Sequence, residues 1–204
     1  KSWIITAYVL AFGGLLLLGG RIGDAIGHKR AFLSGVGIFT IASLVCGVAS
    51  DEATLIVARA VQGVGAAVAA PTGLALIAST YAVGQPRNRA LAVSAAMQAT
   101  GSVLGLVLGG ALTVVSWRLA FLINVPIGIV ALVYSWFALR NDDEKSKPKI
   151  DIVGLLLLSP GLALFLYGIS SSTEAGTFID AKVLTTSIIG LILTFIGTTI
   201  TSIG

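Results

Sequence analysis

One arginine, Arg59, stands inside a long apolar stretch, and Gln62 and Gly63 follow it at helical spacing. A guanidinium inside a bilayer costs several kcal/mol unless it is hydrated or paired. Such a residue therefore normally faces a polar interior and marks a path for ions or substrates. The alternative is an arginine near the membrane surface whose side chain reaches the headgroups. We expect Arg59, Gln62 and Gly63 to line a polar interior.

A second polar group, residues 20–30, separates two apolar stretches and is predicted to be a short loop. Its glycines favour a tight turn. Asp24 either accepts charge-assisted hydrogen bonds from a basic side chain or helix N-terminus, or is solvated, and the sequence leaves both open. His28 is expected to make a polar contact, because no second metal ligand is near it in the sequence. The loop residues singled out are Gly20, Asp24, Gly27, Lys29 and Arg30.

The composition places these residues in a membrane protein. The chain has 204 residues, of which 56% are hydrophobic and 11% charged, whereas a soluble domain carries about 25% charged residues. The net charge of +4 lies in the connections between apolar stretches, which indicates topology signals and no nucleic-acid surface. One cysteine, Cys46, excludes a disulfide within the chain. The sequence contains no phosphate loop, zinc-protease, nucleophile-elbow or dinucleotide motif, so we expect no enzyme.

Seven apolar stretches approach the roughly 20 residues that a helix needs to cross a bilayer. The predicted fold is all-α, a polytopic bundle of about seven membrane helices. A hydrophilic stretch after the fifth helix divides the chain into residues 1–140, a linker at 141–151, and residues 152–204. The predicted spans are Trp3–Gly20, Ala31–Ala49, Leu55–Thr80, Ala90–Val115, Phe121–Leu139, Ile152–Ile169 and Val183–Ile203.

Lysine and arginine are distributed unequally between alternate connections. Nine lie in residues 20–30, 81–89 and 140–151, against three in the opposite set. Cytoplasmic loops carry this excess, so we expect these three segments in the cytoplasm and an integral protein of the cell membrane. Lys1 is then outside, and because the chain shows no signal peptide, we expect an upstream helix to be missing. The nine are Arg21, Lys29, Arg30, Arg87, Arg89, Arg140, Lys145, Lys147 and Lys149.

Four motifs in order resemble the major facilitator superfamily. Residues 20–30 resemble its loop between the second and third helices, and residues 59–67 its fourth-helix motif. A glycine series is similar to the antiporter motif of its fifth helix, and a later series to the start of the sixth helix in the fourteen-helix drug:proton antiporter branch. The glycines are Gly101, Gly105, Gly109 and Gly110; the later series includes Trp117, Arg118, Asn124 and Pro126.

The resemblance implies that the seven spans are family helices two to eight, within a fragment that lacks the first helix and most of the C-terminal half. The last two are either the central pair of the fourteen-helix branch or the start of that half. Two positions depart from the family pattern: Ala25 replaces an arginine and Leu106 a proline. The proline's absence removes the reason to expect a bend in that helix.

The function implied by the resemblance is proton-coupled efflux of small amphipathic molecules by alternating access. A proton gradient supplies the energy, with no cofactor or metal; the partners are the substrate, the bilayer and the remainder of the polypeptide. Arg59 with Gln62 would tune protonation of a carboxylate on the missing helix, the fifth-helix glycines would permit sliding, and Asp24 with its loop would form a cytoplasmic latch. The alternatives are uptake or exchange of a metabolite, and a non-transporting scaffold or receptor.

Overall fold

The computed structural model describes residues 2–139, 160–165, 167 and 181–203, and every regular element among them is helical. The predicted all-α bundle is confirmed, and five segments within the described ranges are long and apolar enough to span a membrane. The helices are α1 (Ser2–Ile26), α2 (His28–Val48), α3 (Glu52–Thr80), α4 (Gln85–Val115), α5 (Trp117–Leu122), α6 (Asn124–Ala138) and α8 (Ala181–Ile203).

The first five predicted spans correspond to α1, α2, α3, α4 and the pair α5–α6. The fifth span is divided beside Ile123, three residues before Pro126. A proline lacks the N–H that would bond the carbonyl four residues earlier, which explains a break at this point. The seventh span coincides with α8, whereas most of the sixth, and the whole linker at 141–151, lie outside the described residues.

Two predicted loops are much shorter than expected. Helix α1 continues through residues 20–26, and α2 begins at His28, so Gly27 alone separates them. Gly27 has a φ of 93°, a backbone conformation that strongly favours glycine. Residues 85–89 likewise belong to α4, which leaves 81–84 as the connection. Both predictions were wrong because charged residues were taken as loop, whereas a helix can continue beyond its apolar part.

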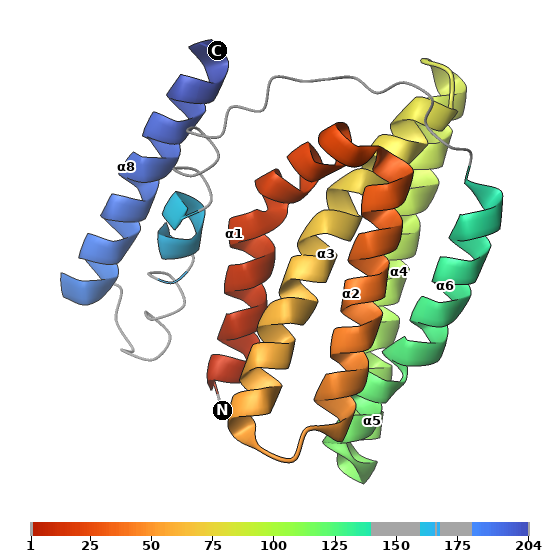
Figure 1. Ribbon diagram of the computed structural model, residues 1–204, viewed down its shortest axis with the longest axis vertical. Coiled ribbons are helices and arrows are strands. Elements are labelled where there is room, and N and C mark those ends of the chain that lie inside the picture. Colours follow the sequence, from red (N-terminus) through yellow and green to blue (C-terminus); the bar gives the residue numbers. More distant parts are fainter. Residues whose placement is uncertain (1, 140–159, 166, 168–180, 204) are drawn as a thin grey trace.

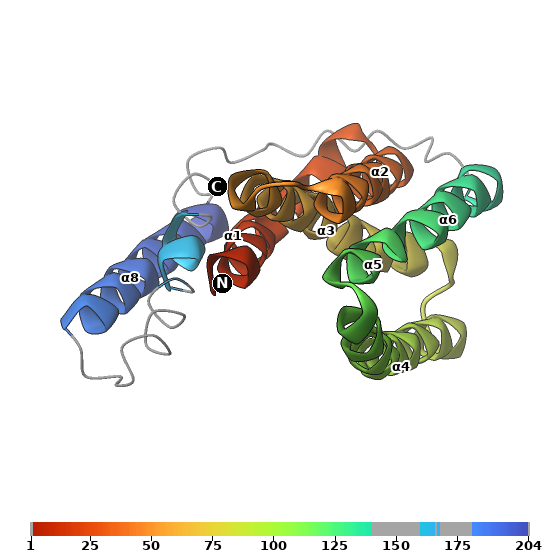
Figure 2. The same ribbon diagram turned by 90° about the horizontal axis from the view of Figure 1, so that it is seen from below.

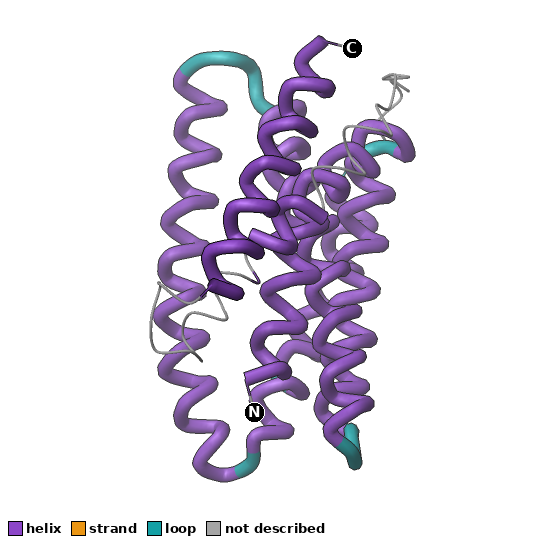
Figure 3. The backbone as a smooth tube through the Cα atoms, turned by 90° about the vertical axis from the view of Figure 1, so that its left-hand side faces the viewer, coloured by secondary structure: helices purple, strands orange, loops and turns teal. Residues whose placement is uncertain are grey.

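The helices run up and down, and α3 lies between α1 and α2 (Figure 1). Helix α6 packs on α2, and α4 joins the rest mainly through α5, as Figure 2 shows from below. In Figure 3 the short connections are teal and α4 runs along one side of the bundle. The turn at Gly27, the connection 81–84 and the end of α6 gather at one end of the bundle (Figure 1). The cations of residues 20–30 and 85–89 therefore share that end.

Very close approaches hold α3 against α1 and α2. A Cβ built on Gly65 would lie 2.6 Å from the backbone nitrogen of Phe39 and 2.8 Å from the carbonyl oxygen of Gly35. A Cβ on Gly63 would lie 2.6 Å from the carbonyl oxygen of Tyr8. Close packing of small residues replaces hydrophobic burial as the attraction between helices in lipid. Helices α1, α2 and α3 are therefore the most closely packed part of the described fold.

Asp51 caps the N-terminus of α3 and makes the stability of this helix sensitive to acid. The carboxylate accepts hydrogen bonds from the backbone N–H of Thr54, at 2.8 Å, and from its hydroxyl, at 2.6 Å. These bonds lower the pKa of the Asp51 carboxyl. Because the folded-state pKa is the lower one, this stabilisation is present above the unfolded value of about 3.9 and is lost as pH falls through the folded value.

We expect the thermal midpoint of the purified chain in detergent to fall more steeply with acid than that of Asp51→Asn below about pH 4. The asparagine variant keeps a side-chain acceptor for Thr54 but does not titrate. Parallel curves for the two proteins, followed by circular dichroism, would contradict the assignment.

Candidate functional site around Arg59

Arg59 projects from α3 toward α1 and α5 and is partly buried. Its Nε donates to the carbonyl oxygen of Ile4 at 3.3 Å. The guanidinium carbon lies 4.4 Å from the ring centre of Tyr8 and 5.5 Å from that of Phe121. The π face of an aromatic ring attracts a cation, so these two rings stabilise the charge where water is partly excluded. The arginine therefore faces the protein, as the sequence analysis predicted.

Gln62 continues the polar face one helical turn further along α3. Its Oε1 accepts a hydrogen bond from Arg59 Nη1 at 2.7 Å, and its Nε2 donates to Ser43 Oγ at 2.6 Å. Ser43, on α2, donates in turn to the carbonyl oxygen of Phe39 at 2.8 Å. Gln62 is 1% exposed and Ser43 is 0% exposed. A buried chain of hydrogen bonds thus fixes the guanidinium from the side of α2.

An apolar core lies beside this site, near the connection between α2 and α3. It consists of Cys46, Ala49, Leu55 and Ala58, with Ile4 and Phe121 packed against it. Among the described residues, no ion pair joins Arg59 to a carboxylate. Within this part of the chain the guanidinium is held by a carbonyl, an amide and two rings, which leaves it able to attract an anionic group.

A cleft of about 440 Å³ lies beside the site. It is bordered by Tyr8 and Phe12 of α1, by alanines of α3 and by Gln98 of α4. A second pocket, of about 1150 Å³, is bordered by Gln85, Arg89 and Met97 of α4, and Gln98 borders it as well. Because Tyr8 also stacks on Arg59, one side chain connects the partly buried cation with the cleft.

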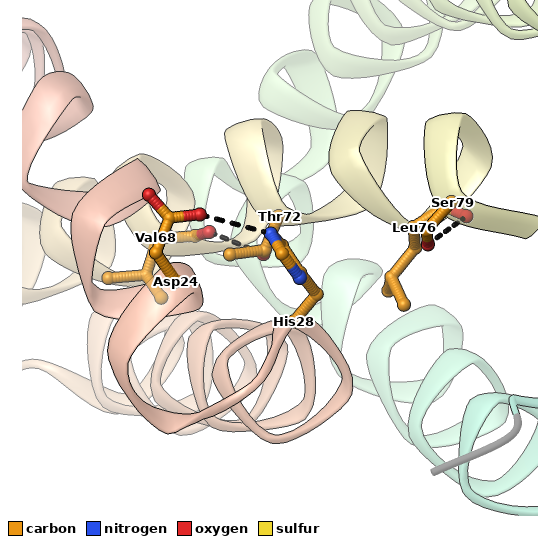
Figure 4. Close-up of polar contacts among 6 residues, drawn as sticks. All are labelled: Asp24, His28, Val68, Thr72, Leu76 and Ser79. Atoms are coloured by element: carbon orange, nitrogen blue, oxygen red, sulfur yellow. Dashed lines mark hydrogen bonds and ion pairs between the residues drawn. The ribbon is translucent and has the colours of Figure 1, made fainter. Parts of the chain in front are cut away.

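The residues of the first connection do not form one cluster. Asp24 and His28 approach each other, with 3.3 Å between Oδ1 and Nε2, across the turn between α1 and α2 (Figure 4). Thr72 of α3, also drawn in Figure 4, is fully buried and donates to the carbonyl oxygen of Val68 at 2.6 Å. A Cβ on Gly20 would be in ordinary contact with Pro71 of α3, 3.7 Å away. Arg30 is exposed.

Lys29 connects this end of α2 with the end of α6. Its Nζ donates to the carbonyl oxygens of Trp136, at 3.0 Å, and Leu139, at 2.5 Å. The last carbonyls of a helix have no partner within the helix, and a cation near them is favourable. Lys29 therefore caps α6, a partner that the sequence analysis did not predict.

We expect Lys29→Met to lower the stability of the contact between α2 and α6 by about 1 kcal/mol, the usual effect of one such cation. Amide hydrogen exchange at the end of α6 should become faster, whereas Lys29→Arg, which keeps several donors, should change it little. Equal exchange in Lys29→Met and the unmodified chain would show that the contact contributes nothing.

The two later motifs differ in how far the structure supports them. For Gly101, Gly105, Gly109 and Gly110, an added Cβ would meet no atom within 4 Å in the described structure, so the expected close packing is not observed there. Helix α4 is continuous through Leu106, in agreement with the absence of proline at that position.

The sixth-helix series makes defined contacts. Arg118 stacks on Trp117, with 5.2 Å from the guanidinium carbon to the ring centre. Its Nη2 donates to the carbonyl oxygen of Ala49, just after α2, at 2.9 Å. Asn124 donates to the carbonyl oxygen of Ala120 at 3.5 Å. Arg118 therefore joins α5 to one end of α2, while Lys29 joins α6 to the other.

Sequence reasoning missed Ser43, Tyr8 and Phe121, which hold the arginine in place. Ser43 carried one usable signal, because it lies on the same face of α2 as the small buried residues Gly35 and Cys46. The two aromatic residues carried none, since their types are common in any apolar stretch.

Comparison with known proteins agrees with the family resemblance of the sequence motifs. A family model described as Major Facilitator Superfamily matches residues 1–204. The transporter EfpA of Mycobacterium tuberculosis, described as an uncharacterized MFS-type transporter, is 56% identical over 176 residues, which are 86% of this chain and 33% of that protein.

Two further relatives carry names that refer to export or resistance. The cephamycin export protein CmcT of Amycolatopsis lactamdurans is 42% identical over 178 residues, 86% of this chain and 37% of its own length. A multidrug resistance protein B homolog of Mycobacterium tuberculosis is 40% identical over 194 residues, 94% of this chain and 36% of its own length. The chain thus spans about a third of the length of these relatives.

Proposed function

The chain belongs to the major facilitator superfamily, and from this premise we propose that it forms part of a proton-coupled transporter that exports small amphipathic molecules. Members of this superfamily are membrane transporters, not enzymes. The names of the relatives, a cephamycin exporter and a multidrug resistance protein, support export as the direction. Because the chain is about a third as long as those relatives, the proposal concerns a full-length protein that contains it.

The observation that carries the proposal is the position of Arg59 between a buried hydrogen-bond chain and the cleft. The guanidinium is held by Gln62 and Tyr8, and Tyr8 also borders the cleft. A fixed positive charge lowers the pKa of a nearby carboxyl group and so controls when it binds a proton. In this proposal Arg59 with Gln62 regulates a carboxylate contributed by a helix outside the present chain, and the proton gradient drives the cycle.

The remaining motifs have supporting roles in this proposal. Gly101, Gly105 and Gly109 recur every four residues on one side of α4, with Gly110 next to them in the chain, and these small residues would let a further helix slide along α4. In this proposal Asp24, which lies 3.3 Å from His28 across the turn between α1 and α2, forms a cytoplasmic latch with that turn. The excess of cations at this end of the bundle supports a cytoplasmic location for residues 20–30 and 81–89, and residues 140–151 are assigned there by their charge.

A vesicle experiment separates the candidate functions. The full-length protein is reconstituted into liposomes that contain a pH-sensitive fluorophore, and a fluorescent amphipathic dye is added outside. We expect dye movement in one direction to be accompanied by proton movement in the other. Dye and protons that move in the same direction would instead indicate uptake. Dye movement without proton movement would indicate uncoupled exchange, and the absence of both would indicate a scaffold or receptor.

A further inference from the structure

We propose that Ser43 is a positioning residue for Arg59, acting through the side-chain amide of Gln62. The inference rests on the proposed function, because it assigns Ser43 a part in proton coupling. Ser43 touches neither the cleft nor the guanidinium. Its effect is transmitted from α2 to α3 by two consecutive hydrogen bonds of 2.6 and 2.7 Å.

The direction of these bonds follows from the single proton of the Ser43 hydroxyl. That proton is donated to the carbonyl oxygen of Phe39, at 2.8 Å, so only the oxygen lone pairs remain for Gln62. The amide must therefore present its NH₂ group to Ser43 and its carbonyl oxygen to Arg59. A rotated amide would place the NH₂ group against the guanidinium and oxygen against oxygen.

Burial makes this orientation costly to lose. Ser43 and Gln62 are 0% and 1% exposed, so water cannot take over as the partner of either. An amide group left without its partner in such surroundings keeps the full cost of its desolvation. Without the Ser43 hydroxyl, the NH₂ group of Gln62 loses its partner, and the amide is held in place only by its bond to Arg59, so Nη1 has a less firmly fixed acceptor.

Thr40 provides a matched control on the same helix. Its hydroxyl also donates to a carbonyl four residues earlier, Val36, at 2.7 Å, and it is 6% exposed. It lies against Gly128 of α6, whereas Ser43 contacts Gln62 of α3. Removing that hydroxyl as Thr40→Val therefore disturbs a buried helix contact of the same kind without disturbing Arg59.

The test follows the Nη1 proton of Arg59 that is donated to Oε1 of Gln62. The chain is labelled with ¹⁵N-arginine in detergent micelles, and Arg59→Lys assigns the signal. We expect Ser43→Ala to raise the hydrogen-exchange rate of this proton roughly tenfold, the effect of losing one buried hydrogen bond. Ser43→Cys, which keeps a weak acceptor and donor, should give an exchange rate between those of Ser43→Ala and the unmodified chain. Thr40→Val should give the rate of the unmodified chain. Equal exchange in Ser43→Ala and Thr40→Val would overturn the proposal, as would an effect of the same size in Ser43→Cys.

A second measurement distinguishes this inference from the proposed function. In the full-length protein, Ser43→Ala should shift the pH dependence of dye export, whereas Thr40→Val should leave the profile in place. If Arg59 exchange rises in Ser43→Ala and the pH profile does not move, the positioning by Ser43 stands and the coupling role of Arg59 is wrong.

Discussion

Gly65→Ala is expected to lower the stability of the bundle by about 1–3 kcal/mol, the usual cost of adding a methyl group to a filled interior. The added Cβ would lie 2.6 Å from the nitrogen of Phe39 and 2.8 Å from the oxygen of Gly35, and both are backbone atoms. Neither can move without displacing α2 from α3. The thermal midpoint of the purified chain in detergent, followed by circular dichroism, measures the effect.

Gly37→Ala, on α2, is the control for this prediction. A Cβ at Gly37 would meet no atom within 4 Å in the described structure, and alanine is a better helix former than glycine by about 1 kcal/mol. The two substitutions should therefore change the midpoint in opposite directions. A similar change in both would mean that the close approach of α2 and α3 does not stabilise the bundle.

Arg59→Ala is expected to abolish proton-driven export by the full-length protein while leaving membrane insertion intact. The substitution removes the bonds to Ile4 and Gln62 and the charge over the rings of Tyr8 and Phe121. Dye retention by cells that express the variant should equal that of cells without the transporter. Protease protection of the connections would confirm insertion.

Two substitutions refine this result. Arg59→Lys keeps the charge but not the planar guanidinium that bonds and stacks at once, so it should recover little export. Arg87→Ala removes a cation in the first turns of α4, far along the chain from the site, and should export dye at the unmodified rate. Full export by Arg59→Ala would remove the arginine from the mechanism.

Much of the fold could be predicted from the sequence, because the bilayer requires long apolar helices and few other solutions exist. The five spans up to residue 138 were found, and the inward position of Arg59 followed from the cost of a charge in lipid. Helix ends were harder. Charged residues at 20–26 and 85–89 suggested loops, yet only Gly27 and residues 81–84 leave the helix.

The partners of the site residues were beyond sequence reasoning. Whether Gln62 meets a serine on α2 or a group on α1 depends on the rotation of each helix about its axis, which small differences in packing decide. The glycines illustrate the same limit. Gly35 and Gly65 lie against each other, whereas a Cβ on Gly101 would meet no atom of the described structure, although all three occur in similar small-residue patterns. Lys29 was expected in a latch with Asp24 and instead caps α6.

A reconstitution of the full-length protein can separate the coupling of proton movement to export, the role proposed for Arg59, from transport itself. Liposomes that contain the full-length protein or its Arg59→Ala variant are given either a pH gradient or a dye gradient, and dye movement is followed. We predict that the variant fails to accumulate dye under the pH gradient but still lets dye equilibrate down its own gradient. Accumulation by the variant at the unmodified level under the pH gradient would show that Arg59 does not couple proton movement to export.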